Sequence, residues 1–135
     1  MIRLTSNRFN SLCGMNKSMK ILAVDDEPLN LMIIKELFED SHEIILAESG
    51  EEAMEQLSQS TPDIMLLDVM MPGIDGLEVC KQVRANPEMN DVKIIMVSGK
   101  AMDHDIQKGL AVGANHYVSK PFDMMDLVDL VEGYN

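Results

Sequence analysis

Residues 20–26 read Lys-Ile-Leu-Ala-Val-Asp-Asp, a short aliphatic run that ends in two adjacent carboxylates. The pattern recurs along the chain, because Asp68 follows the run Ile-Met-Leu-Leu at 64–67 and Lys120 follows His-Tyr-Val-Ser at 116–119. Continuous apolar runs such as the first two are typical of strands buried on both faces of a parallel sheet. The carboxyl ends of parallel strands meet at one edge of an open α/β sheet, where ligands bind. We therefore expect the charged residues that end these runs to lie together.

From residue 20 onward, short apolar runs alternate five times with longer amphipathic segments. The predicted strands are Lys20–Val24, Glu43–Ala47, Asp63–Leu67, Lys93–Val97 and His116–Ser119. The predicted helices cover residues 28–40, 50–60, 76–86, 103–113 and 123–133. Pro28 suits a first helical turn, and Ser49 with Glu52 forms a capping-box signature. The alternation predicts an α/β fold in which a five-stranded parallel sheet lies between two layers of helices.

The formal net charge of the 135-residue chain is −12, and it is unevenly distributed. Residues 1–24 hold four basic residues and no acid, which leaves seven basic residues against all 23 acids from Asp25 onward, a net charge of −16. Such a body repels nucleic acid and anionic membranes, so we expect neither as a partner. The two cysteines, Cys13 and Cys80, indicate no disulfide framework and fit a reducing, cytoplasmic location.

The first 18 residues differ from the rest in charge and pattern. They contain several serines and asparagines and show no clear periodicity, so we expect residues 1–18 to be a flexible N-terminal tail before a single domain at 19–133. An alternative is that translation starts at Met15 or Met19.

The charges expected at the sheet edge define a chemistry. Two carboxylates about 5 Å apart repel each other by roughly 3 kcal/mol at an effective dielectric constant near 20. A hard divalent cation relieves this repulsion, and Asp25, Asp26 and Asp68 supply the oxygen ligands that Mg²⁺ prefers. Lys120 adds a positive charge that can hold an incoming anion. The set predicts a Mg²⁺ site next to an aspartate that carries a phosphoryl group.

Four elements in this order resemble the receiver domain of two-component response regulators: Asp25-Asp26, residues 68–76 (Asp-Val-Met-Met-Pro-Gly-Ile-Asp-Gly), Ser98, and Lys120-Pro121-Phe122. Each element alone is common, whereas all four in order, each at the end of its own strand, are a specific signal. The resemblance spans about residues 19–133. It implies a flavodoxin-like (βα)5 fold with strand order 2-1-3-4-5, which the chemotaxis member of this family also illustrates.

The resemblance also implies a role for each of these residues. Asp68 would be the phosphoacceptor, with Lys120 and Ser98 assisting the phosphoryl transfer. Ser98 and Tyr117 would be the switch residues that respond to phosphorylation. The metal ligands would be Asp26 directly, Asp25 mainly through water, Asp68, and the backbone carbonyl of Met70, with Mn²⁺ able to replace Mg²⁺. A cis peptide bond is implied between Lys120 and Pro121.

The function implied is a phosphorylation-activated signalling domain that catalyses only its own phosphorylation and dephosphorylation. A partner phosphohistidine, on a histidine kinase or a histidine phosphotransfer protein, would supply the phosphoryl group. The surface formed by the fourth helix, the fifth strand and the fifth helix would then change and control an output or relay partner.

Some positions depart from the family pattern. Met70 and Lys100 lie two residues beyond the phosphoacceptor and beyond the hydroxyl, where an apolar and a long side chain would slow hydrolysis of the acyl phosphate. His116 occupies a position where receivers that dimerise in the DNA-binding winged-helix subfamily usually have an acid. The last helix is acidic and has no arginine, which argues against that mode of dimerisation.

Three other functional interpretations fit the sequence less well. A phosphatase of the haloacid dehalogenase type needs a second aspartate at the position of Met70. A flavodoxin-type cofactor carrier would have a Ser-, Thr- or Gly-rich phosphate loop where this chain has Asp25-Asp26-Glu27. A receiver that acts without phosphate is disfavoured because the acids, Ser98 and Lys120 are all present.

Overall fold

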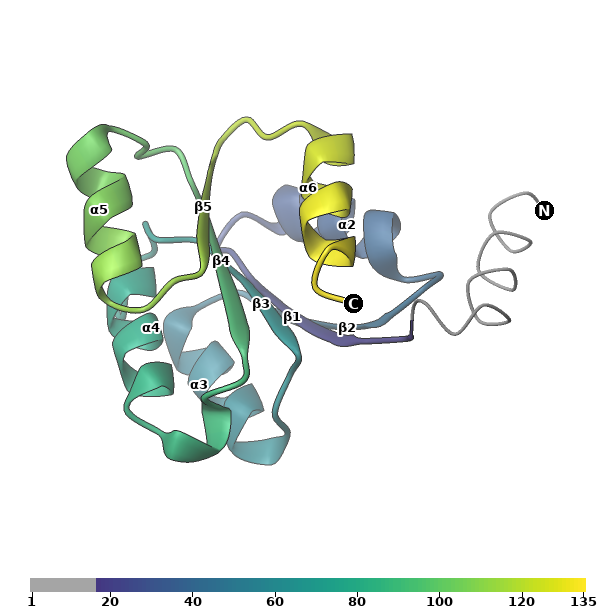
Figure 1. Ribbon diagram of the computed structural model, residues 1–135, viewed down its shortest axis with the longest axis horizontal. Helices are drawn as coiled ribbons and strands as arrows, with labels where there is room; N and C mark the ends of the chain where they lie inside the picture. Colours follow the sequence, from purple (N-terminus) through teal and green to yellow (C-terminus); the bar gives the residue numbers. More distant parts are fainter. Residues whose placement is uncertain (1–16) are drawn as a thin grey trace.

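A computed structural model describes residues 17–135 and shows a five-stranded sheet with helices on both faces (Figure 1). All strand pairings are parallel, and the strand order is β2-β1-β3-β4-β5. The strands are β1 (Lys20–Val24), β2 (Glu43–Ala47), β3 (Ile64–Leu67), β4 (Lys93–Ser98) and β5 (His116–Ser119). The predicted fold class and strand order are confirmed. Cys13 and nearly all of the expected tail lie outside the described residues.

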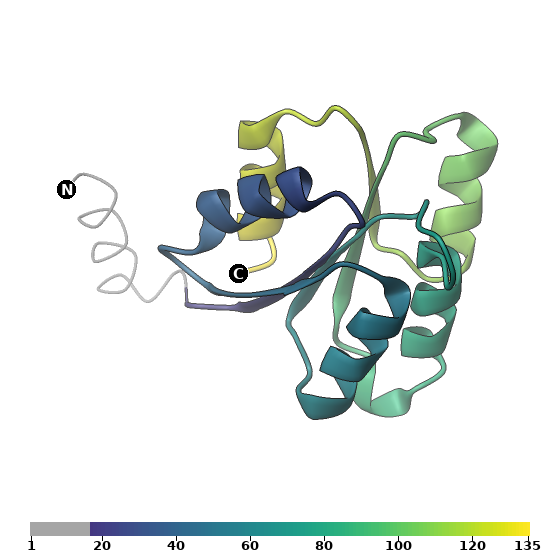
Figure 2. The same cartoon turned by 180° about the vertical axis from the view of Figure 1, so that it is seen from behind.

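Five α-helices cover this sheet in the described range. They are α2 (Pro28–Phe38), α3 (Gly50–Gln59), α4 (Gly76–Arg84), α5 (Asp103–Ala111) and α6 (Met124–Glu132). The helices α2 and α6 pack on one face, and α3, α4 and α5 lie on the other, as the two opposite views show (Figures 1 and 2). No helix between residues 17 and 135 combines the length and hydrophobicity needed to cross a bilayer.

The central strands form the core because both of their faces are covered. All four residues of β3 are buried, and alternate residues of β1 join opposite halves of the core. Ile21 and Ala23 pack with α2 and α6, whereas Leu22 and Val24 pack with α3 and α4. Burial on both faces explains why these strands read as continuous apolar runs in the sequence.

Local signals in the sequence set where several helices begin. The Ser49 hydroxyl accepts a hydrogen bond from the Glu52 N–H at 3.0 Å, as the capping-box signature predicts. The carboxylates of Asp75 and Asp123 cap α4 and α6 in the same way. Each helix ends one or two residues earlier than the sequence predicts. One element is missed, a single 3-10 turn at Pro87–Met89 that Asn86 caps.

The turn from β3 into α4 is tightly packed at Gly76. Its N–H donates to the Val69 carbonyl at 2.9 Å, which brings the start of α4 against the segment after β3. A Cβ atom at this position would collide with the Asp68 carbonyl and lie 2.8 Å from the Val69 Cα. Only glycine fits, because both neighbours are backbone atoms that cannot rotate away. In contrast, a Cβ atom at Gly99 would meet nothing within 4 Å.

We predict that Gly76→Ala lowers the free energy of unfolding by about 1–3 kcal/mol, because the backbone around Asp68 must move. The control Gly99→Ala should change it by less than about 0.5 kcal/mol. Urea denaturation followed by circular dichroism measures both. Equal stabilities of the two variants would show that the packing at Gly76 is not tight.

Candidate functional site

The charged residues that follow the strands are held in place by the strand ladder itself. The Asp25 N–H donates to the Ala47 carbonyl at 3.1 Å, and the Asp68 N–H donates to the Val24 carbonyl at 2.9 Å. On the far side of the sheet, the Lys120 N–H donates to the Ser98 carbonyl at 2.9 Å. Hydrogen bonding therefore continues one residue beyond each strand and places these side chains at one edge of the sheet.

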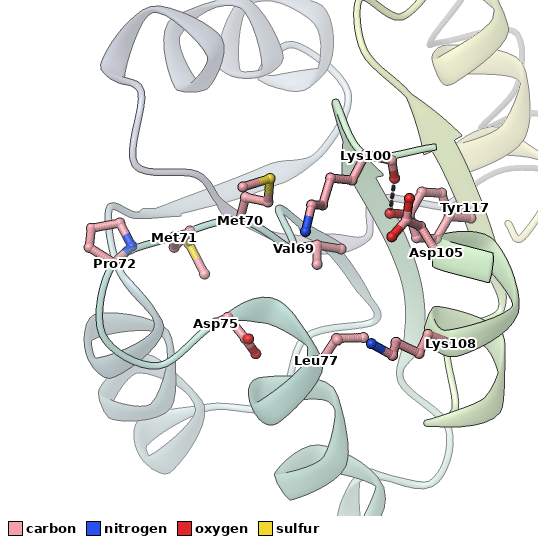
Figure 3. Close-up of a pocket in the computed structure, with 10 residues that line it drawn as sticks. All are labelled: Val69, Met70, Met71, Pro72, Asp75, Leu77, Lys100, Asp105, Lys108 and Tyr117. Atoms are coloured by element: carbon pink, nitrogen blue, oxygen red, sulfur yellow. Dashed lines mark hydrogen bonds between the residues drawn. The ribbon is translucent and has the colours of Figure 1, made fainter. Parts of the chain in front are cut away.

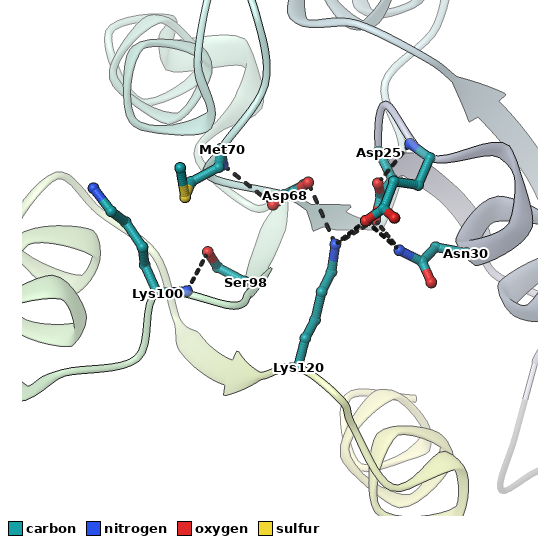
Figure 4. A network of polar contacts seen from close by, with 8 residues as sticks. Asp25, Asn30, Asp68, Met70, Ser98, Lys100 and Lys120 are labelled. Carbon is teal, nitrogen blue, oxygen red and sulfur yellow. Dashed lines mark hydrogen bonds and ion pairs between the residues drawn. The ribbon is translucent and has the colours of Figure 1, made fainter.

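Three carboxylates meet at this edge (Figure 4 shows Asp25 and Asp68). One oxygen from each of Asp25, Asp26 and Asp68 lies within 4.8 Å of the others. Asp25 and Asp68 are 3% and 4% exposed, whereas Asp26 is exposed. Burial of two like charges without a cation between them would be strongly unfavourable.

The Lys120 ammonium provides that charge. Its Nζ lies 2.8 Å from Asp25 Oδ2 and 3.4 Å from Asp68 Oδ2, with Glu27 Oε1 at 3.8 Å (Figure 4). Burial alone would lower the pKa of Lys120. The hydrogen bond to Asp25 and the charges of Asp68 and Asp25 outweigh burial and raise this pKa above its ordinary value. Lys120 therefore remains an ammonium at neutral pH.

Asp25 has further partners, one of which the sequence did not reveal. The Glu27 N–H donates to Asp25 Oδ1 at 2.9 Å, and the Asn30 side-chain amide approaches Asp25 Oδ2 at 3.3 Å. The same Asn30 amide lies 3.1 Å from Glu27 Oε1. Asn30 sits in the first turn of α2, so its position after Pro28 was the only available signal.

Burial and the nearby Lys120 charge act on the Asp68 carboxyl group in opposite directions. Burial raises its pKa from 3.8 to about 6, opposed by the Lys120 charge and reinforced by the Asp25 charge. The Met70 N–H donates to Asp68 Oδ1 at 3.2 Å and favours the ionised form. With a pKa near 6, Asp68 is predominantly a carboxylate at pH 7.

The predicted switch residues both contact the backbone of Lys100. The buried Ser98 hydroxyl accepts a hydrogen bond from the Lys100 N–H at 3.1 Å. The Tyr117 hydroxyl donates to the Lys100 carbonyl, and burial raises the pKa of Tyr117. The sequence pointed to Ser98 and Tyr117 but not to their shared partner, because that contact depends on how the loop after β4 folds.

A cavity of about 540 Å³ opens between Tyr117, Lys100 and the segment after β3 (Figure 3). Its walls include Met70, Tyr117 and two lysines, Lys100 and Lys108. Met70 is 53% exposed. The peptide bond between Lys120 and Pro121 is cis, as expected.

The donor set fits a hard divalent cation. Three clustered carboxylate oxygens are ligands that Mg²⁺ accepts, and the exposure of Asp26 leaves access for the waters that Mg²⁺ retains. A thiol or imidazole that would favour a softer metal is not in this cluster.

The sequence matches a known protein family over most of its length. The family model of the response regulator receiver domain matches residues 21–132. The chain therefore belongs to the receiver-domain family of two-component response regulators.

Solved structures agree with this assignment. A candidate response regulator from Chloroflexus aurantiacus is 34% identical, with a TM-score of 0.81 over 87% of this chain and 98% of that chain. The chemotaxis protein CheY4 of Vibrio cholerae is 28% identical, with a TM-score of 0.82 over 89% of this chain and 100% of that chain. The BeF3-activated receiver domain of DrrB, from Thermotoga maritima, is 26% identical, with a TM-score of 0.80 over 87% and 97% of the two chains.

The raised pKa of Asp68 predicts a pH-dependent stability. Because the pKa of Asp68 is higher in the folded state than in the unfolded state, ionisation of Asp68 destabilises the fold. The free energy of unfolding therefore decreases as pH rises from about 4 through 6. Asn does not titrate. In EDTA, the stability gained by Asp68→Asn should therefore be roughly 1 kcal/mol larger at pH 8.0 than at pH 5.0. Urea denaturation at the two pH values measures this difference.

Asp91→Asn, at an exposed position outside the site, is the matched control for this measurement. Its effect should be similar at the two pH values. An equal gain from Asp68→Asn at pH 5.0 and pH 8.0 would contradict the raised pKa.

Proposed function

We propose that this chain is a phosphoacceptor domain, in which Asp68 receives a phosphoryl group from the phosphohistidine of a histidine kinase or a histidine phosphotransfer protein. The observation that best supports this proposal is the position of Lys120 Nζ between the carboxylates of Asp25 and Asp68. A lone buried carboxylate would be a poor site for an anion, whereas a carboxylate beside an ammonium can accept one.

The proposed transfer forms one bond and breaks one bond. A carboxylate oxygen of Asp68 attacks phosphorus, forming a P–O bond as the P–N bond to the partner histidine breaks. The departing imidazole nitrogen keeps the electron pair of that bond. Lys120 would stabilise the negative charge on the phosphoryl oxygens, and the Ser98 hydroxyl would donate to one of them after transfer. Hydrolysis of the acyl phosphate by water would reset Asp68.

Mg²⁺ is the cofactor that this site would hold, with Mn²⁺ as a substitute. Its ligands would be Asp26, Asp68 and the Met70 carbonyl, with Asp25 acting mainly through water. This division fits the contacts, because Asp25 oxygens already accept protein donors whereas Asp26 is exposed. When bound, the cation neutralises the carboxylates and the phosphoryl oxygens.

The proposed switch runs through the peptide groups of Lys100. In the structure, Ser98 accepts from the Lys100 N–H, and Tyr117 donates to the Lys100 carbonyl. A Ser98 hydroxyl that turns toward a phosphoryl group would loosen this loop and release the Tyr117 hydroxyl. Phosphorylation then favours one of two arrangements through contacts made in only one of them. The responding surface would be α5, β5 and α6, which are the fourth helix, fifth strand and fifth helix of the family fold.

This proposal also implies the bounds of the domain, its location and its output. The receiver domain would occupy residues 19–133 in the cytoplasm, and it would catalyse only its own phosphorylation and dephosphorylation. Its output would be a protein or an effector domain that recognises the switched surface. The charge of −16 from Asp25 onward disfavours direct contact with nucleic acid or an anionic membrane.

Acetyl phosphate with Mg²⁺ tests the phosphoacceptor directly. Intact-mass measurement should show one added phosphoryl group on the wild type and none on Asp68→Asn or in EDTA. The control Asp91→Asn should be labelled like the wild type, because it removes an acid outside the site. Full labelling of Asp68→Asn would overturn the assignment.

The proposed conformational switch can be tested by NMR. With beryllofluoride as the acyl-phosphate mimic, amide NMR signals of residues 100–120 should shift in addition to those around Asp68. Tyr117→Phe should reduce the shifts in α5 but leave those around Asp68. Shifts confined to residues 25–27 and 68–72 would contradict the switch.

A further inference from the structure

An apolar groove runs between α2 and α6 on the face of the sheet away from the 540 Å³ cavity. It consists of two adjoining hollows of about 530 and 370 Å³ that share Ile33 and Met124. The second hollow reaches Lys120 and Pro121, so the groove ends beside the acidic site. We call it the α2–α6 groove; its apolar lining is Leu29, Met32, Ile33, Leu37, Phe122, Met124, Met125 and Val128.

Large apolar side chains are unusually exposed in this groove. Leu29, Met32, Met124 and Met125 are 68%, 62%, 54% and 65% exposed. Within residues 17–135 they are four of the seven large hydrophobic side chains that are exposed. Clustered exposure of this kind marks a contact surface, and methionine side chains adapt to varied apolar partners.

The chain enters the domain close to this groove. The Lys17 N–H donates to the Asn135 side-chain oxygen at 2.8 Å, and the Asn135 amide donates to the Lys17 carbonyl at 2.6 Å. Residue 17 is therefore fixed just beyond the C-terminal end of α6. The nine residues of α6 span about 14 Å at 1.5 Å per residue. Sixteen extended residues reach up to about 55 Å, so residues 1–16 can cover the whole groove.

The composition of residues 1–16 complements the groove. This segment contains Arg3 and Arg8 and no acid, and it offers Ile2, Leu4, Phe9, Leu12 and Met15 as apolar side chains. Besides its apolar residues, the groove is lined by Glu27, Asn30, Glu36 and Lys120, and the Lys120 ammonium is already paired with Asp25. Exposed Asp123, Asp126 and Asp129 add further negative charge along α6. An apolar segment with only positive charges suits an apolar groove with an acidic rim.

We propose that residues 1–16 of the same chain occupy the α2–α6 groove. The tether to residue 17 gives this segment an effective concentration of about millimolar, so a weak contact is enough to fill the groove.

A spin label on Cys13 tests this placement in the full chain. Cys80 is fully buried, so Cys13 is the reactive thiol. We expect the nitroxide to broaden the ε-methyl NMR signals of Met32, Met124 and Met125 to loss. The Met102 signal should persist, because Met102 is 67% exposed but precedes α5 on the opposite face.

A pair of tail variants separates a specific contact from random collisions. Phe9→Asp should restore the three groove signals, because it places a carboxylate in an apolar and acidic groove. Asn10→Asp adds the same charge at a polar position and should leave them broadened. On the groove side, Met125→Glu should release the tail, whereas Met102→Glu should not.

Three results would overturn the proposal. The groove methyl signals could persist in the labelled chain, or Phe9→Asp and Asn10→Asp could have equal effects. Broadening could also appear only between a spin-labelled chain and a second, isotope-labelled chain, which would assign the groove to a second copy. All these NMR measurements use unphosphorylated protein, so a result that contradicts the groove proposal would leave the proposed role of Asp68 intact.

Discussion

The ion pairs of Lys120 with Asp25 and Asp68 are the interactions on which the site depends. Lys120 follows β5, which is three places from β1 in the sheet, or about 14 Å at the usual strand spacing. Only a long side chain on a loop that turns toward β1 reaches Asp25. The ammonium lies 2.8 Å from one buried carboxylate and 3.4 Å from another, so it offsets a repulsion that would otherwise oppose folding.

The Lys120 ammonium offsets the cost of burying these carboxylates only in part, and the residual cost favours binding of a further cation. Asp68 keeps a pKa raised to about 6 although an ammonium lies beside it. The fold thus holds a carboxylate that an added cation would stabilise. Functional sites often sacrifice stability in this way, and the stability comes from the buried central strands instead.

Much of the fold was predictable because its signals are local or periodic. The apolar runs of β1, β3 and β4 and the Ser49 cap of α3 could be recognised in the sequence without any tertiary information. The strand order was not derivable from spacing and came from the resemblance to receiver domains. The turn at Pro87–Met89 was missed because a single 3-10 turn has no periodicity.

The residues of the site likewise differ in how far the sequence could predict them. The residues that end strands were predictable, since parallel strands bring their carboxyl ends together. Asn30 and the Lys100 backbone were not, because their contacts with Asp25, Ser98 and Tyr117 depend on loop conformation. The site also has two unlike flanks, a cavity with Lys100 and Lys108 on one side and the apolar α2–α6 groove on the other.

The affinity for Mg²⁺ tests most directly whether the clustered carboxylates form a cation site. Isothermal titration calorimetry should show one Mg²⁺ bound to the wild type and binding at least about tenfold weaker to Asp26→Asn, because a charged oxygen ligand is lost. Glu27→Gln, which removes the adjacent exposed acid, should bind Mg²⁺ nearly as the wild type does. An unaltered affinity of Asp26→Asn, or an equal loss in both variants, would contradict a specific site formed by Asp25, Asp26 and Asp68.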